Sequence, residues 1–263
     1  MKIGITQFVL GNQTLSESLD LCREAGYEAI ELLFREGKDL DFTMSVAEVE
    51  AVGKKCEAAG VEIASVIATR SKGGNLLSTN GEERQTGKER LRRSLEIAGI
   101  LGVNCTLLHP GQLTPEGTYD NAWNWLQEVL LELIPVAEAN QVVIAVENVW
   151  NKFLLSPREM AQFVDDVGSE WVGTYLDTAN MMAYGYTEHW IRGLGKRIKK
   201  VHFKDFSRSK HSFTPLMEGD TDWPLVMKEL RGIGYTDPVI HEVGGSRKDL
   251  IETARRMRQI VAL

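Results

Sequence analysis

Short apolar segments alternate with longer amphipathic stretches along the whole chain. Eight of the short segments are rich in Val and Ile and apolar nearly throughout, which is typical of parallel strands covered on both faces. Between them, apolar residues recur at helical spacing, as at Leu91, Leu95 and Ala98, and this spacing indicates amphipathic helices. We expect strands at Lys2–Phe8, Ala29–Phe34, Val61–Ala68, Val103–His109, Val142–Glu147, Trp171–Asp177, Ile198–His202 and Pro238–Glu242.

The repeat length of this pattern predicts a closed barrel. Eight units in 263 residues give about 33 residues per unit, the size of one strand–helix crossover unit. Eight such units close into a (β/α)8 TIM barrel. An open doubly wound sheet is the alternative, but Phe8–Asn12 lacks the glycine fingerprint that usually follows its first strand. No linker or low-complexity tract divides the chain, so we expect residues 1–263 to form a single α/β domain.

Polar residues close several of the apolar segments, at the barrel end where TIM-barrel active sites lie. Glu147, Asp177 and His202 close the fifth, sixth and seventh segments, about one barrel unit apart. The eighth ends at His241 and Glu242, which point to opposite faces of a strand. Alternation alone does not decide which of these two faces the lumen. Four consecutive strands thus each supply one potential metal ligand to the same rim.

With Glu242 as the fourth ligand, the set has three carboxylates and one imidazole. Such an oxygen-rich set suits Mn²⁺ best, with Mg²⁺ or Co²⁺ as alternatives. The three carboxylates would repel one another without a cation. Further residues are candidates for substrate binding or, alternatively, for local loop capping. They are Glu31 and His109, which lie in the second and fourth strands, and Lys204, which shares a strand face with His202.

The composition and net charge limit the classes of molecule that the protein could bind. The net charge of −7 argues against nucleic acid, because binding phosphates requires clustered cations. No apolar run approaches the roughly 20 residues of a membrane span, and no basic leader opens the chain. Cys22, Cys56 and Cys105 are odd in number and widely spaced, so we expect reduced, buried thiols in a cytoplasmic protein. A small-molecule substrate fits best, and a homo-oligomer is compatible with the sequence.

The chain resembles the xylose isomerase-like barrel family of sugar phosphate isomerases and epimerases. The resemblance covers essentially the whole chain and is strongest from Val143 onward. Within the family, Glu147–Phe153 is most similar to the branch of L-xylulose-5-phosphate 3-epimerase and hexulose-6-phosphate isomerase. The motifs that carry the resemblance are Val146–Asn148, Leu176–Asn180, Lys200–Asp205 and Glu218–Trp223.

The resemblance implies a metal-dependent epimerase or isomerase acting on a ketose or ketose phosphate. It assigns the strand-eight carboxylate to Glu242 rather than to His241. It further implies that Glu147 and Glu242 form an acid/base pair on opposite faces of the reacting carbon. One would remove a proton to give a cis-enediolate, and the other would return it. Return to the same carbon is epimerisation, and return to its neighbour is aldose–ketose isomerisation.

The same resemblance suggests contacts to the substrate. Asn180 occupies a position where the free-ketose epimerases commonly carry His, so we expect it to orient a sugar hydroxyl. Arg208 matches a substrate-binding Arg, although a solvated loop cation is an equal alternative. The segment Gly244, Gly245 and Ser246 opens the last helix. Its amides could bind a phosphate, or it could be a plain turn and N-cap.

Two other activities compete with this interpretation. An apurinic endonuclease would use several zinc ions, more histidines and a basic face for DNA, and this chain has five histidines and a charge of −7. A dehydratase of a cyclic keto-sugar, of the inosose type, would use the same metal site and the same proton abstraction. It differs only in the fate of the enediolate.

Overall fold

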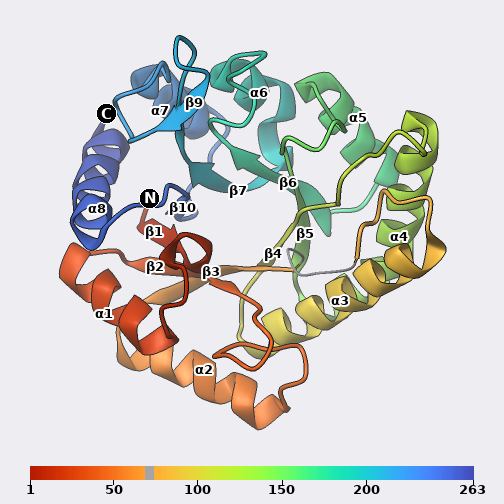
Figure 1. Cartoon of the computed structure of the whole chain (residues 1–263), viewed down its shortest axis with the longest axis horizontal. Coiled ribbons are helices and arrows are strands. Elements are labelled where there is room, and N and C mark those ends of the chain that lie inside the picture. The colour runs from red at the N-terminus through yellow and green to blue at the C-terminus, as the bar shows by residue number, and fades with distance from the viewer. Residues whose placement is uncertain (69–73) are drawn as a thin grey trace.

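The computed structural model describes residues 1–68 and 74–263, and within them a closed parallel barrel forms the centre of the molecule (Figure 1). Its strand order is β1-β10-β7-β6-β5-β4-β3-β2. All eight predicted strands are present in the barrel, which confirms the (β/α)8 fold. They are β1 Ile3–Thr6, β2 Ala29–Leu33, β3 Glu62–Ile67, β4 Cys105–Leu108, β5 Val143–Glu147, β6 Val172–Asp177, β7 Ile198–Phe203 and β10 Val239–His241.

Helices surround the barrel (Figure 1). Several begin at a capping box, in which a hydroxyl and a carboxyl three residues later satisfy the first free amides, as at Thr14, Ser45 and Ser246. Short 3₁₀ turns occur at η1 Gln7–Leu10 and η2 Gly195–Arg197. The described helices are α1 Leu15–Ala25, α2 Val46–Ala58, α3 Gly81–Ile100, α4 Tyr119–Asn140, α5 Pro157–Val167, α6 Thr187–Leu194, α7 Trp223–Gly232 and α8 Arg247–Ala262.

A hairpin that the sequence did not predict follows β7. Its strands, β8 Asp205–Ser207 and β9 Ser212–Thr214, pair antiparallel outside the barrel. The hairpin lies at the carboxyl end of β7, so it stands over the barrel mouth. His211, at its turn, has a positive φ of 50°.

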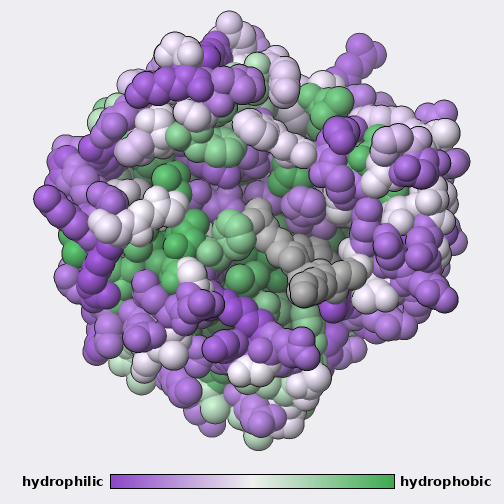
Figure 2. Space-filling view, in the orientation of Figure 1, coloured by the Kyte–Doolittle hydropathy of each residue, from purple (hydrophilic) through white to green (hydrophobic). Residues whose placement is uncertain are grey.

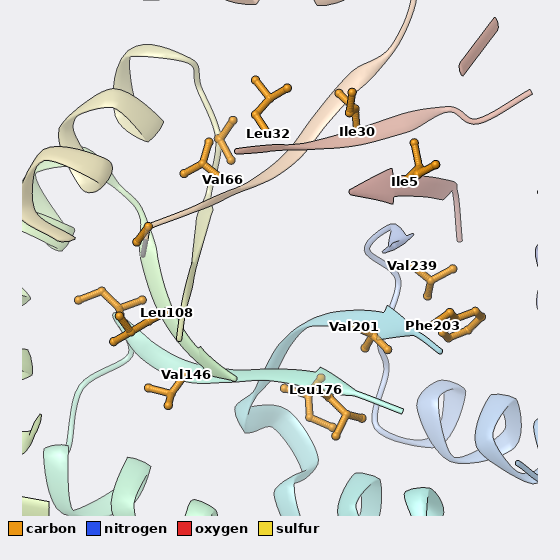
Figure 3. Packing of buried hydrophobic residues seen from close by; sticks show 14 of the residues in the cluster. Ile5, Ile30, Leu32, Val66, Leu108, Val146, Leu176, Val201, Phe203 and Val239 are labelled. Atoms are coloured by element: carbon orange, nitrogen blue, oxygen red, sulfur yellow. The ribbon is translucent and has the colours of Figure 1, made fainter. Parts of the chain in front are cut away.

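The main core lies between the barrel and the helices. Val146, Leu176 and Val201 belong to it, and Figure 3 shows them on the outer side of their strands. Because strand side chains alternate, the residues next to them, Glu147, Asp177 and His202, point into the lumen. The outward packing of the strands therefore turns the predicted ligands inward.

The chain ends meet at the amino-terminal end of the barrel strands. Met1, just before β1, and Val261, in the last turn of α8, line one small pocket of about 210 Å³. The three cysteines are free and buried, as expected. In the part of the chain that the structure describes, every helix is too short or too polar to cross a bilayer.

Candidate metal centre

Four buried side chains converge at the carboxyl end of the barrel strands. Glu147 and Asp177 are the last residues of β5 and β6, His202 lies near the end of β7, and Glu242 follows β10 directly. Each offers one ligand atom, and these atoms all lie within 4.8 Å of one another. The structure thus brings together the four residues that the sequence analysis named as metal ligands.

The choice between His241 and Glu242 is settled by the strand face. The His241 ring points toward helix α8, where the Tyr27 hydroxyl lies 3.2 Å from its Nδ1 and also donates to the carbonyl of Leu250. Burial lowers the pKa of His241 to about 3, so the ring is neutral. Glu242, on the opposite face, belongs to the cluster.

The ring of His202 is held in one orientation. Its Nε2 lies 3.0 Å from Oε1 of Glu31, a buried carboxylate that can accept the Nε2 proton. Its Nδ1 faces the cluster, 3.4 Å from Glu147 Oε1 and 3.5 Å from Glu242 Oε2. Burial disfavours the imidazolium, but the charges of Glu31 and Glu242 outweigh burial and raise the pKa of His202 well above its usual value. The atom available to a metal is therefore Nδ1.

Glu31 lies behind His202 and is shielded from solvent. Its Oε2 accepts hydrogen bonds of 2.7 Å from the hydroxyls of Ser65 and Tyr175. Burial alone would raise its pKa, but His202 and these hydroxyl donors lower it, so the carboxylate is charged. The sequence analysis expected Glu31 among the substrate contacts, and in the structure its carboxylate lies against His202, a member of the four-residue cluster.

Asp177 is anchored through one oxygen and open at the other. Its Oδ1 accepts 2.7 Å hydrogen bonds from the amides of Ala179 and Asn180, while its buried Oδ2 has no hydrogen-bond partner. Burial raises the pKa of Asp177 to about 6; the Lys204 ammonium opposes this effect, and Glu242 and Glu147 add to it. The carboxylate thus presents to the cluster an oxygen that no hydrogen bond occupies.

Lys204 lies at the edge of the cluster. Its Nζ is 3.1 Å from Glu242 Oε2, 3.4 Å from Asn180 Oδ1 and 3.6 Å from Asp177 Oδ2. It also lies 4.1 Å from the centre of the Phe213 ring, which the β8–β9 hairpin supplies. Burial works against its charge, but the carboxylates of Asp177 and Glu242 raise its pKa above the usual value. Lys204 and Asn180 therefore lie where a molecule at the cluster would contact them.

The other predicted contacts lie farther out. Arg208 is exposed; its guanidinium donates to the carbonyl of Gly185 at 2.7 Å and stacks 4.3 Å from the Tyr186 ring. His109 is half-buried, and its Nδ1 accepts from the amide of Gly111 at 3.2 Å. Neither belongs to the four-residue cluster.

At the start of α8, the predicted phosphate segment contacts the chain itself. The amide and hydroxyl of Ser246 both donate to the Asp249 carboxylate, at 2.9 and 2.6 Å. A Cβ at Gly245 would lie 2.8 Å from the Asp249 side chain. A phosphate at Gly244, Gly245 and Ser246 would have to compete with this negative charge.

The cluster fits a divalent cation. It contains buried polar atoms, Asp177 Oδ2 and His202 Nδ1, that lack a hydrogen-bond partner in the described residues. A buried polar atom without a partner costs free energy, which a bound cation would recover. The contact from Glu31 to the far nitrogen of His202 is the second contact that metal-binding histidines usually make.

Sequence reasoning missed Ser65, Tyr175 and Asp205. Tyr175 shares the inward face of β6 with Asp177, two residues away, so strand alternation could have placed it in the lumen. Ser65 gave no separate signal, because an isolated hydroxyl is common in a strand. Asp205 belongs to the motif Lys200–Asp205, but the hydrogen bonds that its carboxylate accepts from residues 217–223 could not be read from the sequence.

Two proteins of known sequence are similar to this chain along most of its length. SgbU of Haemophilus influenzae, provisionally named an L-ribulose-5-phosphate 3-epimerase, is 24% identical over 99% of this chain and 95% of its own length. Its namesake in Escherichia coli is 24% identical over 92% and 88%.

Among solved structures, a D-tagatose 3-epimerase-like protein superposes with a TM-score of 0.85 at 21% identity, covering 100% of this chain and 97% of the other. An L-ribulose 3-epimerase superposes with a TM-score of 0.83 at 22% identity, covering 99% and 93%. The sequence profile of the xylose isomerase-like TIM barrel matches residues 19–260. The chain therefore belongs to the xylose isomerase-like TIM barrel family.

Proposed function

We propose that this protein is a metal-dependent epimerase or isomerase of a ketose or ketose phosphate. The observation that carries the proposal is the buried cluster of Glu147, Asp177, His202 and Glu242, whose ligand atoms lie within 4.8 Å of one another. The relatives are named as sugar epimerases, and these names support the same class of substrate.

Glu147, Asp177, His202 and Glu242 would hold the metal, with Mn²⁺ as the best match and Mg²⁺ or Co²⁺ as alternatives. When bound, the cation would polarise the sugar carbonyl and favour loss of a proton from the adjacent carbon. Glu31 would fix His202 so that Nδ1, not Nε2, is the ligand atom.

The two glutamates are suited to move the proton. Glu147 and Glu242 come from β5 and from the residue after β10, and each carries an oxygen within 3.5 Å of His202 Nδ1. We assign to one carboxylate the removal of the proton from the carbon beside the carbonyl, and to the other its return on the opposite face. Lys204, which donates to Glu242, and Asn180 would orient the substrate hydroxyls. General acid–base catalysis of this kind contributes about 10²–10⁴-fold.

Solvent isotope exchange tests the proposal. The protein with Mn²⁺ is incubated in D₂O with free and phosphorylated pentuloses and hexuloses, and deuterium in the recovered sugar is measured by NMR. We expect exchange with at least one ketose. Loss of water to an unsaturated product would indicate the dehydratase instead, and absence of exchange across the panel would refute the proposal.

A matched pair of variants tests the acid/base role. Glu242→Gln keeps an oxygen for the metal but cannot take up a proton, so we expect exchange to fall by about 10²-fold or more while metal binding is partly retained. Glu57→Gln makes the same change at an exposed position of α2 and serves as the control. Near-native exchange in Glu242→Gln would remove this residue from the catalytic role.

A further inference from the structure

A pocket of about 650 Å³ opens beside the four-residue cluster, and we call it the side pocket. It lies between the segment 148–157, which follows β5, and the segment 180–190, which follows β6, at the side of the barrel where α5 and α6 lie (Figure 1). In Figure 2 the apolar residues of this face gather mainly in its middle and to the left, away from α5 and α6. Small-molecule sites commonly have about 300–1,000 Å³, so the side pocket is large enough for a ligand. Aromatic side chains line part of the pocket, namely Trp150, Tyr184, Tyr186 and Trp190.

The side pocket adjoins the proposed catalytic residues through Asn180. Asn180 lines the pocket, and its Oδ1 lies 3.4 Å from Lys204 Nζ, which in turn lies 3.1 Å from Glu242 Oε2. Its Nδ2 donates to the carbonyl of Asn148, which also lines the pocket, at 2.9 Å. Asn180 therefore links the side pocket to Lys204 and Glu242 at the edge of the cluster.

The wall of the side pocket is held in place before any ligand arrives. Lys152 and Leu154 have positive φ values of 65° and 53°, a strained conformation for residues other than glycine. The surrounding contacts hold it: the Leu154 amide donates to the Tyr119 hydroxyl at 2.8 Å, and the Trp150 indole donates to the Asn180 carbonyl at 2.5 Å. Strain held in this way is common at ligand-binding loops.

The lining favours a neutral, ring-shaped ligand. Among the described residues that line the pocket, Lys152 is the one side chain with a permanent charge. The hydroxyl of Tyr184 and the amide of Asn180 can bond to sugar hydroxyls, while the aromatic rings provide flat apolar faces. A phosphate would need more cations, and the guanidinium of Arg208 is already directed to the Gly185 carbonyl and the Tyr186 ring.

We propose that the side pocket binds the non-reacting part of the substrate, a second sugar ring joined to the ketose by a glycosidic bond. This inference rests on the proposed function and deepens it, because it assigns a substrate class. The ketose unit lies at the four-residue cluster, and the second ring packs between the segments 148–157 and 180–190.

A filling variant tests the assignment. A Cβ at Gly185 would lie 3.6 Å from the Met181 carbonyl oxygen and 3.7 Å from Trp190 Nε1, ordinary contacts within the pocket lining, and the backbone there has no positive φ. Gly185→Leu should therefore fold and take up space in the lining of the side pocket. Gly185→Ala adds only the Cβ and is the matched control.

The probes are maltulose and isomaltulose, two glucosyl-fructoses of different linkage, compared with D-fructose in the D₂O exchange assay. We expect one of the disaccharides to have a kcat/KM about tenfold or more above that of fructose. Gly185→Leu should lower the disaccharide value at least tenfold, leave fructose within about twofold, and differ from Gly185→Ala, which should resemble the parent protein.

Other outcomes overturn the inference. Equal loss on disaccharide and fructose, or a preference for D-fructose 6-phosphate that Gly185→Leu removes, would exclude a neutral second ring. A change of oligomeric state in Gly185→Leu, measured by sedimentation, would identify the side pocket as a contact between copies of this chain.

A binding measurement separates this inference from the proposed function. Trp150 and Trp190 line the side pocket, so disaccharide binding should change the tryptophan fluorescence, and the change should disappear in Gly185→Leu. If every ketose fails to exchange while this titration succeeds, the proposed reaction is wrong and the side pocket stands. If both disaccharides leave the fluorescence unchanged, the side pocket assignment is wrong.

Discussion

At the scale of single residues, the contact between Glu31 and His202 decides which nitrogen can bind a metal. Replacement of Glu31 by Gln keeps the shape but removes the negative charge that holds the Nε2 proton. Loss of such second contacts typically weakens metal affinity about 10–100-fold, and we expect that range for Glu31→Gln. Competition with a fluorescent chelator measures it, with Glu57→Gln as control. An affinity within about twofold of the parent would contradict the role of Glu31.

The residues of the metal cluster could be predicted from the sequence because each interrupts or ends an apolar strand. A carboxylate or imidazole at such a place is conspicuous, and the barrel topology puts the strand ends together. Glu31 was predicted as a functional residue, but its contact with His202 depends on which side chains meet inside the lumen. Spacing along the chain does not give that information. The hydroxyls of Ser65 and Tyr175 donate to Glu31 at 2.7 Å. Alternation could have placed Tyr175 in the lumen, but its contact with Glu31 could not be read from the sequence.

At the scale of elements, the β8–β9 hairpin is held by the buried carboxylate of Asp205. Its strands have only three residues each, too few for an alternation pattern, which is why the sequence did not predict them. The Phe213 ring of the hairpin stacks on Trp150, with ring centres 5.1 Å apart, so the hairpin and the loop after β5 meet over the cluster. Asp205 accepts hydrogen bonds from the amides of Met217, Gly219 and Thr221, the Thr221 hydroxyl and the Trp223 indole.

Gly219 tests this anchor. A Cβ there would lie 2.2 Å from Asp205 Oδ1 and 2.7 Å from the Phe206 carbonyl oxygen, so Gly219→Ala must displace the carboxylate. We expect a loss of about 1–3 kcal/mol in the free energy of unfolding, measured by urea denaturation. Gly232→Ala, at the end of α7, meets nothing within 4 Å and should be neutral or slightly stabilising. Equal stability of the two variants would show that the contacts to Asp205 contribute little.

At the scale of the whole molecule, the repeat of strand and helix was enough to predict the barrel. The eight strands were found because both faces of each are covered, which makes them apolar throughout. The rim pockets were not predictable, because they depend on how loops of irregular conformation pack. Lys152 and Leu154, with their positive φ values, are residues whose types give no sign of that conformation.

Metal binding should couple to the stability of the whole fold in a pH-dependent way. The pKa of Asp177 is raised to about 6, by burial first, and that of His202 is also raised. A folded-state pKa above the unfolded value means that the metal-free fold loses stability as pH rises through the folded pKa. Metal binding displaces these protons, so metal affinity rises over the same range.

We therefore expect the increase in Tm on adding Mn²⁺, relative to EDTA, to be small at pH 5 and to grow through pH 6 to pH 8. Scanning fluorimetry at fixed metal concentration measures it. Asp177→Asn removes one of the two titrating ligands. Most of the increase in Tm that Mn²⁺ causes should therefore vanish in that variant. An increase in Tm that is the same at every pH would rule out proton competition at these ligands.

Met1 and Val261 line one small pocket at the amino-terminal end of the barrel strands, whereas the four-residue cluster lies at their carboxyl end. The chain ends are therefore separated from the cluster by the full height of the barrel. A short peptide joining them would close the backbone into a ring, and that ring could be reopened at a turn on the same remote side. Such rearranged chains would keep every strand neighbour, because each strand already pairs with parallel partners on both sides. Tags or fused domains at either end would likewise leave the mouth of the barrel unobstructed.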